Sequence, residues 1–528
     1  MVAWYLWCHA RLGQSRPLHG LPALRNSDES ASPKMATNMT AFKEHLTLGR
    51  HIGFVVAAHV WVAALHFLAL PVLTKSLGPT YYGIWSVLNV TISLAAPFAL
   101  LGFSMSLVRF LAAERQTSVI RDDFLSACGV VLLTGTALSL ILYILSETIA
   151  TYVFQEPDAA AFLRLGSALV ALNAVHTLPL AFFRMRRRLG MHALLTIIHQ
   201  TLVTGGMITA LALGYGLHAV IFASICAHVL FCVGSGALII KRIGPAMPSF
   251  SNIGTYLRWG IPLTPNSAIL WIIHSSDRYM VSFFLGVAAT GVYGAAYALG
   301  HYASFFLMPL QTVLYPNIVK TYAEGRHEET AEYLRRAIKY VMMVSIPSAF
   351  GLSILGEPLL RILTTPEFAA GAAVIPPVAA GMVLFCFYQL MVGILHITDH
   401  THINVRVLST CAAVNIGLNL LLIPRMGISG AAWATVAAYG LLGLMTIAVT
   451  RRYFRFSLGL SFVAKSVAAS LVMSVCLYVI APDSVAGILT SIVAGTLVYF
   501  AALFALKGIS TTEVKFFVSV GRSFLQRD

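Results

Sequence analysis

The chain has 528 residues, of which 58% are hydrophobic and only 10% charged, and its formal net charge is +15. Soluble domains carry about 25% charged residues, so this composition excludes an ordinary soluble enzyme or binding module and is typical of a polytopic membrane protein. A basic excess could indicate nucleic-acid binding in a soluble protein. In a membrane protein it is first a topology signal, and we expect no nucleic-acid partner.

The first residues differ in character from the rest of the chain. MVAWYLWCHARLG is apolar but shorter than the about 20 residues that span a bilayer, and RNSDESASPK after it is a polar linker. A signal peptide needs a basic segment before its apolar core. We therefore expect translation to start at Met35, with residues 1–44 as an N-terminal extension that includes non-native sequence; a signal-like segment is the alternative.

The remaining sequence predicts an all-α polytopic membrane protein. We expect about 14 transmembrane helices: a six-helix bundle in residues 45–245, a second in residues 250–455, and two more helices with a cytoplasmic tail in residues 456–528. The linker GPAMPSFSN divides the two halves. The apolar runs are centred near residues 62, 92, 134, 172, 203, 229, 269, 303, 347, 384, 415, 440, 472 and 497.

Two matches at one period indicate an internal duplication. HFLALPVLTKSLGPTYYGIW, from His66 to Trp85, and HSSDRYMVSFFLGVAATGVY, from His274 to Tyr293, share a His, a Leu-Gly pair and a Gly-aliphatic-aromatic triplet at the same spacings. The small residues that begin with Gly216 and with Gly427 match at nearly the same offset. We therefore expect the two bundles to be related as repeats, with chance coincidence of Gly and Ala as the alternative.

Basic residues divide unevenly between alternate loops. Cytoplasmic loops are enriched in Lys and Arg, so the larger set predicts that both termini lie in the cytoplasm. The larger set holds Arg109, Arg115, Arg121, Arg184, Arg186, Arg187, Arg188, Lys241, Arg242, Arg258, Lys320, Arg326, Arg335, Arg336, Lys339, Arg406, Arg451, Arg452, Arg455 and Lys465, and the smaller set holds Lys75, Arg164, Arg278, Arg361 and Arg425.

Motifs of catalysis and cofactor binding are missing from the sequence. The 7 cysteines form no CxxC and no Cys/His ligand spacing, which predicts neither a disulfide framework nor a metal site. The chain has no Walker loop, no GxSxG, no HExxH and no paired carboxylates on one helix face. We expect a protein that is not an enzyme and that uses no cofactor.

Four predicted helices carry a stripe of polar and aromatic residues at helical spacing. Such stripes either join helices or line a wet cavity, and because four of them match between the repeats we expect a shared cavity. Satisfied packing is the alternative for each single histidine. The stripes hold Trp271, His274, Asp277 and Arg278; Tyr293, Tyr297 and His301, continuing to Met308 and Gln311; His66; and Trp85 with Asn89.

Asp277 and Arg278 are the charged pair of these stripes. They precede the loop glycine Gly286 by about eight residues, or roughly 12 Å of helix. A charge at the centre of a membrane helix costs about 2.5–3.5 kcal/mol, so charges kept at depth usually pair or serve a function. We expect Arg278 to contact the substrate, and a structural ion pair with Asp277 is the alternative.

Four segments together resemble a known family: LGPTYYGIW, SLVRFLAAE, SSDRYMVSFFLGVAATGVYGAAYAL and LLIPRMGISGAAWATVAAY. They resemble the polysaccharide transporter family of the multidrug/oligosaccharidyl-lipid/polysaccharide exporter superfamily, over about residues 45–510. The resemblance implies two six-helix bundles around a central cavity that work by alternating access. It also implies flipping of polyprenyl-pyrophosphate-linked oligosaccharides across the bacterial inner membrane, for O-antigen or exopolysaccharide assembly.

Further expectations follow from this resemblance. The partners would be the lipid-linked oligosaccharide, membrane lipid, and a polysaccharide polymerase with its chain-length regulator. Arginine offers a planar fork that matches phosphate oxygens, which suits Arg278 to the pyrophosphate. Aromatic faces and amides commonly hold sugars, a role expected of Trp85, Trp271, Tyr293, Tyr297 and Asn89.

The first span departs from two similar groups of proteins. Peptidoglycan-precursor flippases carry arginines on that span, where this chain has only His59 and His66, and multidrug exporters typically carry an acidic residue there. Both departures favour a polysaccharide substrate. An ion-coupled small-molecule exporter, a peptidoglycan-precursor flippase and a non-transporting scaffold of an assembly complex are the alternatives.

Overall fold

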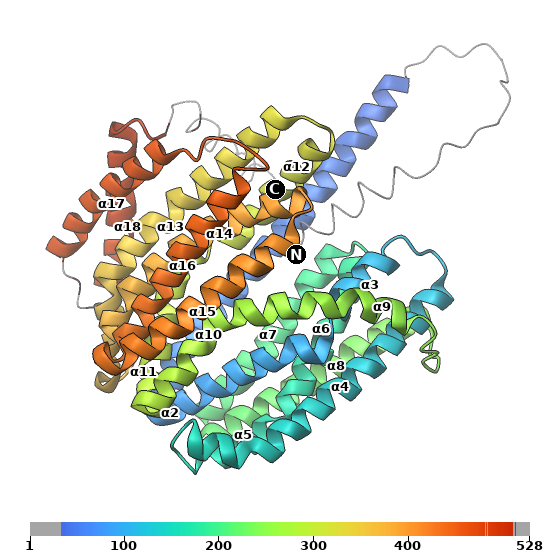
Figure 1. Ribbon diagram of the computed structural model, residues 1–528, viewed down its shortest axis with the longest axis horizontal. Helices are drawn as coiled ribbons and strands as arrows, with labels where there is room; N and C mark the ends of the chain where they lie inside the picture. The colour runs from blue at the N-terminus through green and yellow to red at the C-terminus, as the bar shows by residue number, and fades with distance from the viewer. Residues whose placement is uncertain (1–32, 481, 483, 510–512, 514–528) are drawn as a thin grey trace.

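The computed structural model describes residues 33–480, 482, 484–509 and 513, and these form helices without a strand (Figure 1). The predictions made for the segment before residue 33 lie outside this part of the chain, as does most of the predicted C-terminal tail. The fold is an all-α polytopic membrane protein in which two helical bundles lie side by side (Figure 1).

The first two predicted spans form one run, helix α2 (Pro33–Leu100), which bends at Gly78. This glycine has φ 67° and ψ 176°, a conformation that residues with a Cβ rarely adopt. Pro79 follows, and its missing N–H removes one of the backbone hydrogen bonds that would continue the helix. The expected loop between the spans is therefore a single kink.

The N-terminal bundle packs the helices that follow against α2. The short helices α3 and α5 connect the longer ones. These elements are α3 (Phe103–Leu111), α4 (Thr117–Tyr152), α5 (Ala159–Gly166), α6 (Ala168–Met185), α7 (Leu189–Ala212) and α8 (Leu217–Ile243).

The C-terminal bundle begins after the predicted linker with the short helix α9 (Ile253–Gly260) and the turn η1 (Ile261–Leu263). The helices α17 and α18 pack against α13 on the outside of the bundle (Figure 1). The elements are α10 (Thr264–Leu285), α11 (Val287–His301), η2 (Tyr302–Ser304), α12 (Leu307–Ala323), α13 (His327–Leu363), η3 (Pro366–Val374), α14 (Ile375–Ile397), α15 (Thr401–Met426), α16 (Ile428–Thr450), α17 (Leu460–Ile480) and α18 (Val485–Ala505).

Among the described residues, 11 helices are long and apolar enough to cross a membrane. The kink divides one of them, α2, into two spans. The remaining predicted spans are α10, which is less apolar, and the pair α11 and α12, each of which is shorter than a full span. The predicted number of transmembrane segments is thus confirmed. The span with the charged pair, α10, is thus one that the apolar signal alone misses, and the helix with the tyrosine stripe, α11, is missed because it has only 15 residues.

The matched glycines of the two repeats have matching positions in the fold. Gly286, between α10 and α11, has φ 86° and ψ 166°, close to the values of Gly78. Gly216 and Gly427 each immediately precede the last long helix of their bundle, α8 and α16. The predicted internal repeat is therefore visible in the backbone as well as in the sequence.

The bundles meet most closely where α2 crosses α11. A Cβ built on Gly83 would lie 2.0 Å from the carbonyl oxygen of Val287, and one built on Gly291 would lie 2.0 Å from that of Pro79. Small residues at such crossings allow helix backbones to approach each other in a membrane. The two glycines are equivalent in the repeat, so this crossing relates the halves of the molecule.

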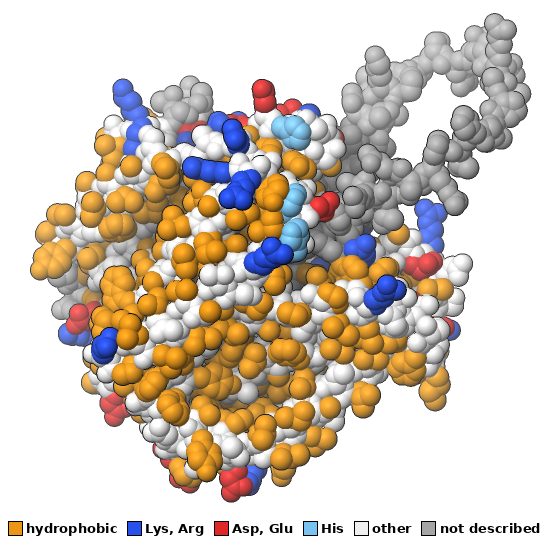
Figure 2. Space-filling model, in the orientation of Figure 1, with side chains coloured by type: hydrophobic (Ala, Val, Ile, Leu, Met, Phe, Trp, Pro, Cys, Tyr) orange, Lys and Arg blue, Asp and Glu red, His pale blue; other side chains and the backbone are white. Residues whose placement is uncertain are grey.

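Figure 2 shows a broad area of hydrophobic side chains over one face of the molecule, with Lys, Arg and His side chains gathered mainly in the upper part of this view. A large exposed apolar surface on a soluble protein would mark an interaction site, but here it is what contact with lipid requires. Together with the apolar helices, this surface identifies a multi-pass membrane protein.

Candidate functional site

The charged pair lies in the C-terminal bundle, where α10 packs against α11 and α16. Asp277 is buried, with 1% of its side chain exposed, and Arg278 retains 12% exposure. Both lie within α10, as the helical spacing predicts. Charges in this position must be satisfied by neighbouring groups, because lipid and apolar side chains offer no hydrogen bonds.

Asp277 is satisfied mainly by α11. Its Oδ2 accepts a hydrogen bond of 2.5 Å from the hydroxyl of Tyr293, which is itself fully buried. Its Oδ1 accepts a bond of 2.8 Å from the backbone N–H of Arg278. The carboxylate therefore ties α10 to α11, and Tyr293 is its anchor.

Arg278 is held by an aromatic ring and a carbonyl. Its guanidinium carbon lies 4.2 Å from the ring centre of Tyr297, within the range of a cation–π interaction. Its Nη1 donates to the carbonyl oxygen of His274 at 3.1 Å and to Asp277 Oδ1 at 3.4 Å. The direct contact of the charged pair is thus long, and the guanidinium stays partly accessible.

His274 points toward the core of the C-terminal bundle. Its Nδ1 lies 2.5 Å from the hydroxyl of Tyr439 on α16, and its ring centre lies 4.5 Å from that of Phe385 on α14. Tyr439 is fully buried. The histidine and the charged pair therefore belong to one buried polar cluster, formed by His274, Asp277, Arg278, Tyr293, Tyr297 and Tyr439, which we call the α10 polar cluster.

Other predicted site residues lie where α2 faces the C-terminal bundle. The indole N–H of Trp271 donates to Ser93 Oγ at 2.8 Å, on the second half of α2. On the same half, Trp85 is half-buried and Asn89 is exposed, with its Nδ2 donating to the carbonyl of Trp85 at 2.7 Å. These three residues lie outside the α10 polar cluster.

The two remaining predicted histidines also lie near the place where α2 faces the C-terminal bundle. His66 is exposed, and its Nε2 accepts a hydrogen bond of 2.8 Å from Gln200 on α7. His301 is exposed at the end of α11, with its ring centre 6.3 Å from that of Tyr297. His66 and His301 lie close enough to interact electrostatically. The structure thus brings residues from α2, α10 and α11 together.

The predicted continuation of the α11 stripe is wrong. The helix ends at His301, a 3₁₀ turn follows, and Met308 and Gln311 lie on the separate helix α12. Pro309 explains the break, because proline has no N–H to donate and its ring clashes with the carbonyl four residues earlier. In the first turn of α12, where that N–H has no partner to lose, the proline is tolerated.

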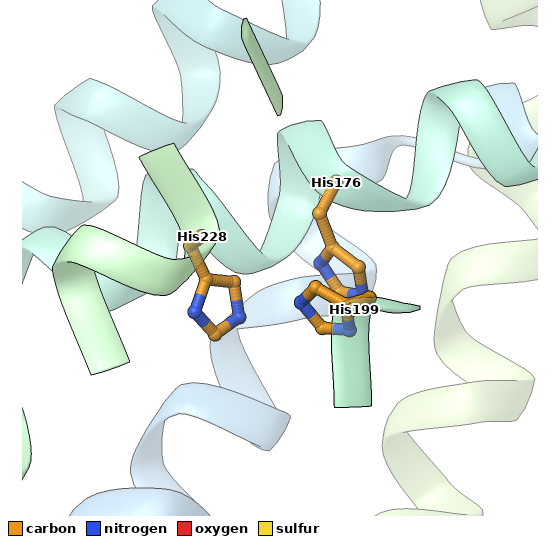
Figure 3. Close-up of side chains that lie close together, drawn as sticks. All are labelled: His176, His199 and His228. Atoms are coloured by element: carbon orange, nitrogen blue, oxygen red, sulfur yellow. The ribbon is translucent and has the colours of Figure 1, made fainter. Parts of the chain in front are cut away.

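Sequence reasoning missed two features. Tyr439 completes the α10 polar cluster from a distant helix, and its only signal was its place in the small-residue segment ISGAAWATVAAY. The structure also gathers His176, His199 and His228, whose ring nitrogens lie within 4.8 Å of one another (Figure 3). Each comes from a different helix, so ligand spacing along the chain could not reveal this histidine triad.

A family model described as "Polysaccharide biosynthesis protein" matches residues 72–372, more than half of the chain. The chain belongs to this family. The match includes α10 and α11, so the α10 polar cluster lies mostly within the part that defines the polysaccharide biosynthesis family.

Two curated relatives of this chain have names that refer to transport. A probable low-salt glycan biosynthesis flippase, Agl15 of Haloferax volcanii, is 20% identical over 72% of this chain and 79% of its own length. The succinoglycan biosynthesis transport protein ExoT of Rhizobium meliloti is 23% identical over 63% of this chain and 65% of its own length.

Among solved structures, the lipid II flippase MurJ in its inward closed conformation superimposes with a TM-score of 0.72. The match covers 84% of this chain and 97% of that one, at 18% sequence identity. At this identity the likeness concerns the fold. It confirms the all-α polytopic architecture that the sequence predicts.

Proposed function

We propose that the protein is a flippase that moves polyprenyl-pyrophosphate-linked oligosaccharides across the bacterial inner membrane by alternating access. Membership of the polysaccharide biosynthesis family supports this proposal, as do relatives named as a glycan flippase and as a succinoglycan transport protein. The observation that carries it is Arg278, a partly accessible cation held inside a membrane helix.

The setting of Arg278 suits a pyrophosphate. A guanidinium offers several donors in a planar fork that matches phosphate oxygens, and stacking on Tyr297 fixes the plane of that fork. The 3.4 Å contact with Asp277 is longer than a strong charge-assisted hydrogen bond. A phosphate could therefore bind Arg278 while Asp277 keeps its shorter bond to Tyr293.

Asymmetry between the repeats argues against a purely structural role. In the first repeat, Ala69 and Leu70 take the places of Asp277 and Arg278, and both are buried. The first repeat therefore packs without a charged residue at these two positions. Because a charge at depth is costly, its presence in only one repeat favours a role in substrate contact.

We assign Tyr293 and Tyr297 a role other than sugar binding. Tyr293 is fully buried and Tyr297 is 5% exposed, so neither presents an aromatic face to a sugar in this conformation. They hold Asp277 and Arg278 instead. Sugar contacts are better assigned to Trp85, Asn89 and Trp271, which are exposed or half-buried where α2 faces the C-terminal bundle.

The proposal extends to the glycan that is carried, to the protein partners and to the bounds of the two bundles. The glycan would serve O-antigen or exopolysaccharide synthesis, with a polysaccharide polymerase and a chain-length regulator as partners. The bundles would divide at residues 45–245 and 250–455, with the extra helices in 456–528. The crossing of Gly83 and Gly291 offers a contact about which these two bodies could move.

Deletion of the gene tests the proposal. Without a flippase, lipid-linked oligosaccharide should accumulate on the cytoplasmic leaflet of the membrane, and expression of the protein should relieve this accumulation. Drug sensitivity without accumulation would instead favour a small-molecule exporter. Loss of polysaccharide with normal flipping would favour a scaffold.

Substitution of Arg278 tests the role of the site. Losing a charge-assisted hydrogen bond costs about 1.5–3 kcal/mol, or roughly ten- to a hundredfold in affinity. Arg278→Ala should therefore strongly impair flipping at normal protein abundance, and Arg278→Lys should retain part of the activity because it keeps the charge. Flipping in a complementation assay, with abundance measured alongside, checks both.

Arg425→Ala is the matched control, because this arginine is exposed at the end of α15. It should flip normally. If Arg278 served only its ion pair, Arg278→Ala would lower abundance, and adding Asp277→Ala would restore both abundance and transport. That rescue would refute the role in substrate contact.

A further inference from the structure

The histidine triad lies in the N-terminal bundle, away from the α10 polar cluster. His176, His199 and His228 come from α6, α7 and α8, three consecutive long helices that pack against one another. Each histidine sits near the middle of its helix, which places the triad near mid-depth in the membrane. Ionisable side chains at this depth are rare and usually have a function.

The three rings turn toward one another (Figure 3). The ring centres of His176 and His199 are 4.3 Å apart and nearly parallel, and the ring of His228 lies edge-on to His199 at 4.7 Å. Their ring nitrogens lie within 4.8 Å of one another. No other group of three or more His, Cys, Asp or Glu residues in the described part of the chain meets the same criterion.

One of these nitrogens has no protein partner: Nε2 of His199 forms no hydrogen bond, although this side chain is only 8% exposed. His176 lies within reach of the backbone carbonyls of Leu172 and Asn173 on its own helix. His228 is 5% exposed, and its Nδ1 pairs with the carbonyl of Ser224 at 2.8 Å. That bond fixes the ring and leaves Nε2 of His228 as the nitrogen available to a ligand. Buried polar atoms without partners are costly, which calls for an explanation.

Packing alone accounts poorly for this arrangement. The ring of Phe231 lies 4.7 Å from that of His199 and covers one side of the triad with an apolar surface. Apolar side chains of similar size would fill this space without leaving polar atoms unpaired. Three imidazoles instead supply three neutral nitrogen donors, which is the donor set that Zn²⁺, Cu²⁺ and Ni²⁺ accept.

We propose that His176, His199 and His228 bind one transition-metal ion, with Zn²⁺ as the expected occupant, which joins α6, α7 and α8 inside the N-terminal bundle. Tetrahedral zinc with Zn–N bonds of about 2.0–2.1 Å places ligand nitrogens about 3.3 Å apart. The triad nitrogens lie within 4.8 Å of one another, so metal binding requires them to move closer and the parallel rings of His176 and His199 to leave their stack. A small anion or water takes the fourth position.

This proposal is independent of the transport proposal, because it concerns another bundle and other residues. The expected effect is on stability, since an ion that binds only the folded chain shifts unfolding to a higher temperature. An ion shared by three helices would make the N-terminal bundle more rigid. The C-terminal bundle contains the α10 polar cluster and no equivalent triad among its described residues.

Metal binding by the purified full-length chain tests the proposal. The protein should carry an affinity tag without histidines, so that the tag itself binds no metal. Titration with Co²⁺, which replaces Zn²⁺ in tetrahedral sites and absorbs visible light, should give absorption bands that saturate at one ion per chain. Added Zn²⁺ should abolish these bands and raise the melting temperature of the protein.

Substitutions within the triad should remove this site. Loss of an outer-shell partner of a metal ligand already weakens binding by about 10–100-fold, so loss of a ligand should cost at least as much. We therefore expect at least a tenfold loss of Co²⁺ affinity for His199→Asn and for His228→Asn, which keep a polar side chain. His228→Cys should keep binding and add a sulfur-to-cobalt charge-transfer band.

His192→Ala is the matched control, because His192 lies on α7 as well and bonds to the carbonyl of Leu180 rather than to the triad. It should bind Co²⁺ as the unaltered protein does. The proposal is overturned if the unaltered protein binds no metal stoichiometrically. It is also overturned if His199→Asn and His228→Asn bind as tightly as His192→Ala, since the metal then lies elsewhere.

Discussion

At the scale of single residues, Asp277 is held chiefly by the hydroxyl of Tyr293, with that of Thr435 also in reach. The carboxylate is 1% exposed, and the 2.5 Å bond from Tyr293 is its shortest side-chain contact. Tyr293→Phe would leave Oδ2 of a buried carboxylate without this donor. We expect a loss of about 1.5–3 kcal/mol in stability, the usual worth of a hydrogen bond to a charged group. Thermal unfolding of the purified protein in detergent checks this.

Tyr302→Phe is the comparison for Tyr293→Phe. The hydroxyl of Tyr302 donates to a neutral carbonyl, that of Ala63, at 3.1 Å. A neutral hydrogen bond contributes about 0.5–1.5 kcal/mol, so this variant should unfold at a temperature closer to that of the unaltered protein. Equal melting temperatures for the two variants would show that Asp277 does not depend on Tyr293.

The sequence was informative about single residues wherever the signal was local. Asp277 and Arg278 are conspicuous because a charged pair interrupts an apolar helix, and the spacing of Tyr293 and Tyr297 by one helical turn puts both on one face. Tyr439 and the histidine triad gave no such signal. Their partners lie on other helices, and only tertiary packing determines which side chains meet.

At the scale of helices, the crossing of α2 and α11 depends on two glycines. A Cβ on Gly83 would lie 2.0 Å from a backbone oxygen, which no side-chain rotation can relieve. Gly83→Ala should therefore force the helices apart and destabilise the protein by about 1–3 kcal/mol or more. The melting temperature and the abundance in membranes are the measurements, and both should fall.

Gly205→Ala serves as the control for this crossing. Gly205 lies within α7, and a Cβ there meets no atom within 4 Å. Because Ala favours helix over Gly by about 0.8–1.0 kcal/mol, this change should be neutral or slightly stabilising. If Gly83→Ala were as stable as Gly205→Ala, the close approach of α2 and α11 would not hold the bundles together.

The elements themselves were largely predictable. Long apolar runs place the helices, and the repeated glycines at Gly78 and Gly286 mark the same bend in both halves. The break after His301 was not anticipated, because a proline inside a membrane helix can produce either a kink or an interruption. The 3₁₀ turn after His301 and the start of α12 at Leu307 show that the chain begins a new helix there.

At the scale of the whole molecule, basic residues gather at matching ends of the two bundles. Arg186, Arg188 and Arg242 line a cavity of about 370 Å³ where α6 and α8 end. Arg335, Lys339, Lys465 and Lys507 line another, of about 260 Å³, near the first turns of α13 and the ends of α17 and α18. Except for Lys507, these residues belong to the set that the sequence assigns to the cytoplasm, and the orientation itself stays a prediction.

This grouping leads to a prediction about orientation in the membrane. Since cytoplasmic loops carry the excess of Lys and Arg, the end of the molecule with both basic cavities should face the cytoplasm. A reporter enzyme that is active only outside the cytoplasm should be inactive when fused after Lys339, close to the second cavity. The same reporter should be active when fused after Asp483.

Fusions in the N-terminal bundle test the same orientation independently. A fusion after Arg188, between α6 and α7, should be inactive, and one after Gln155, between α4 and α5, should be active. The abundance of each fusion protein must be measured, because a degraded fusion is also inactive. The opposite pattern of reporter activity at all four sites would show that the protein has the inverse orientation in the membrane. It would also place both basic cavities outside the cytoplasm, where the positive-inside rule gives them no reason to gather.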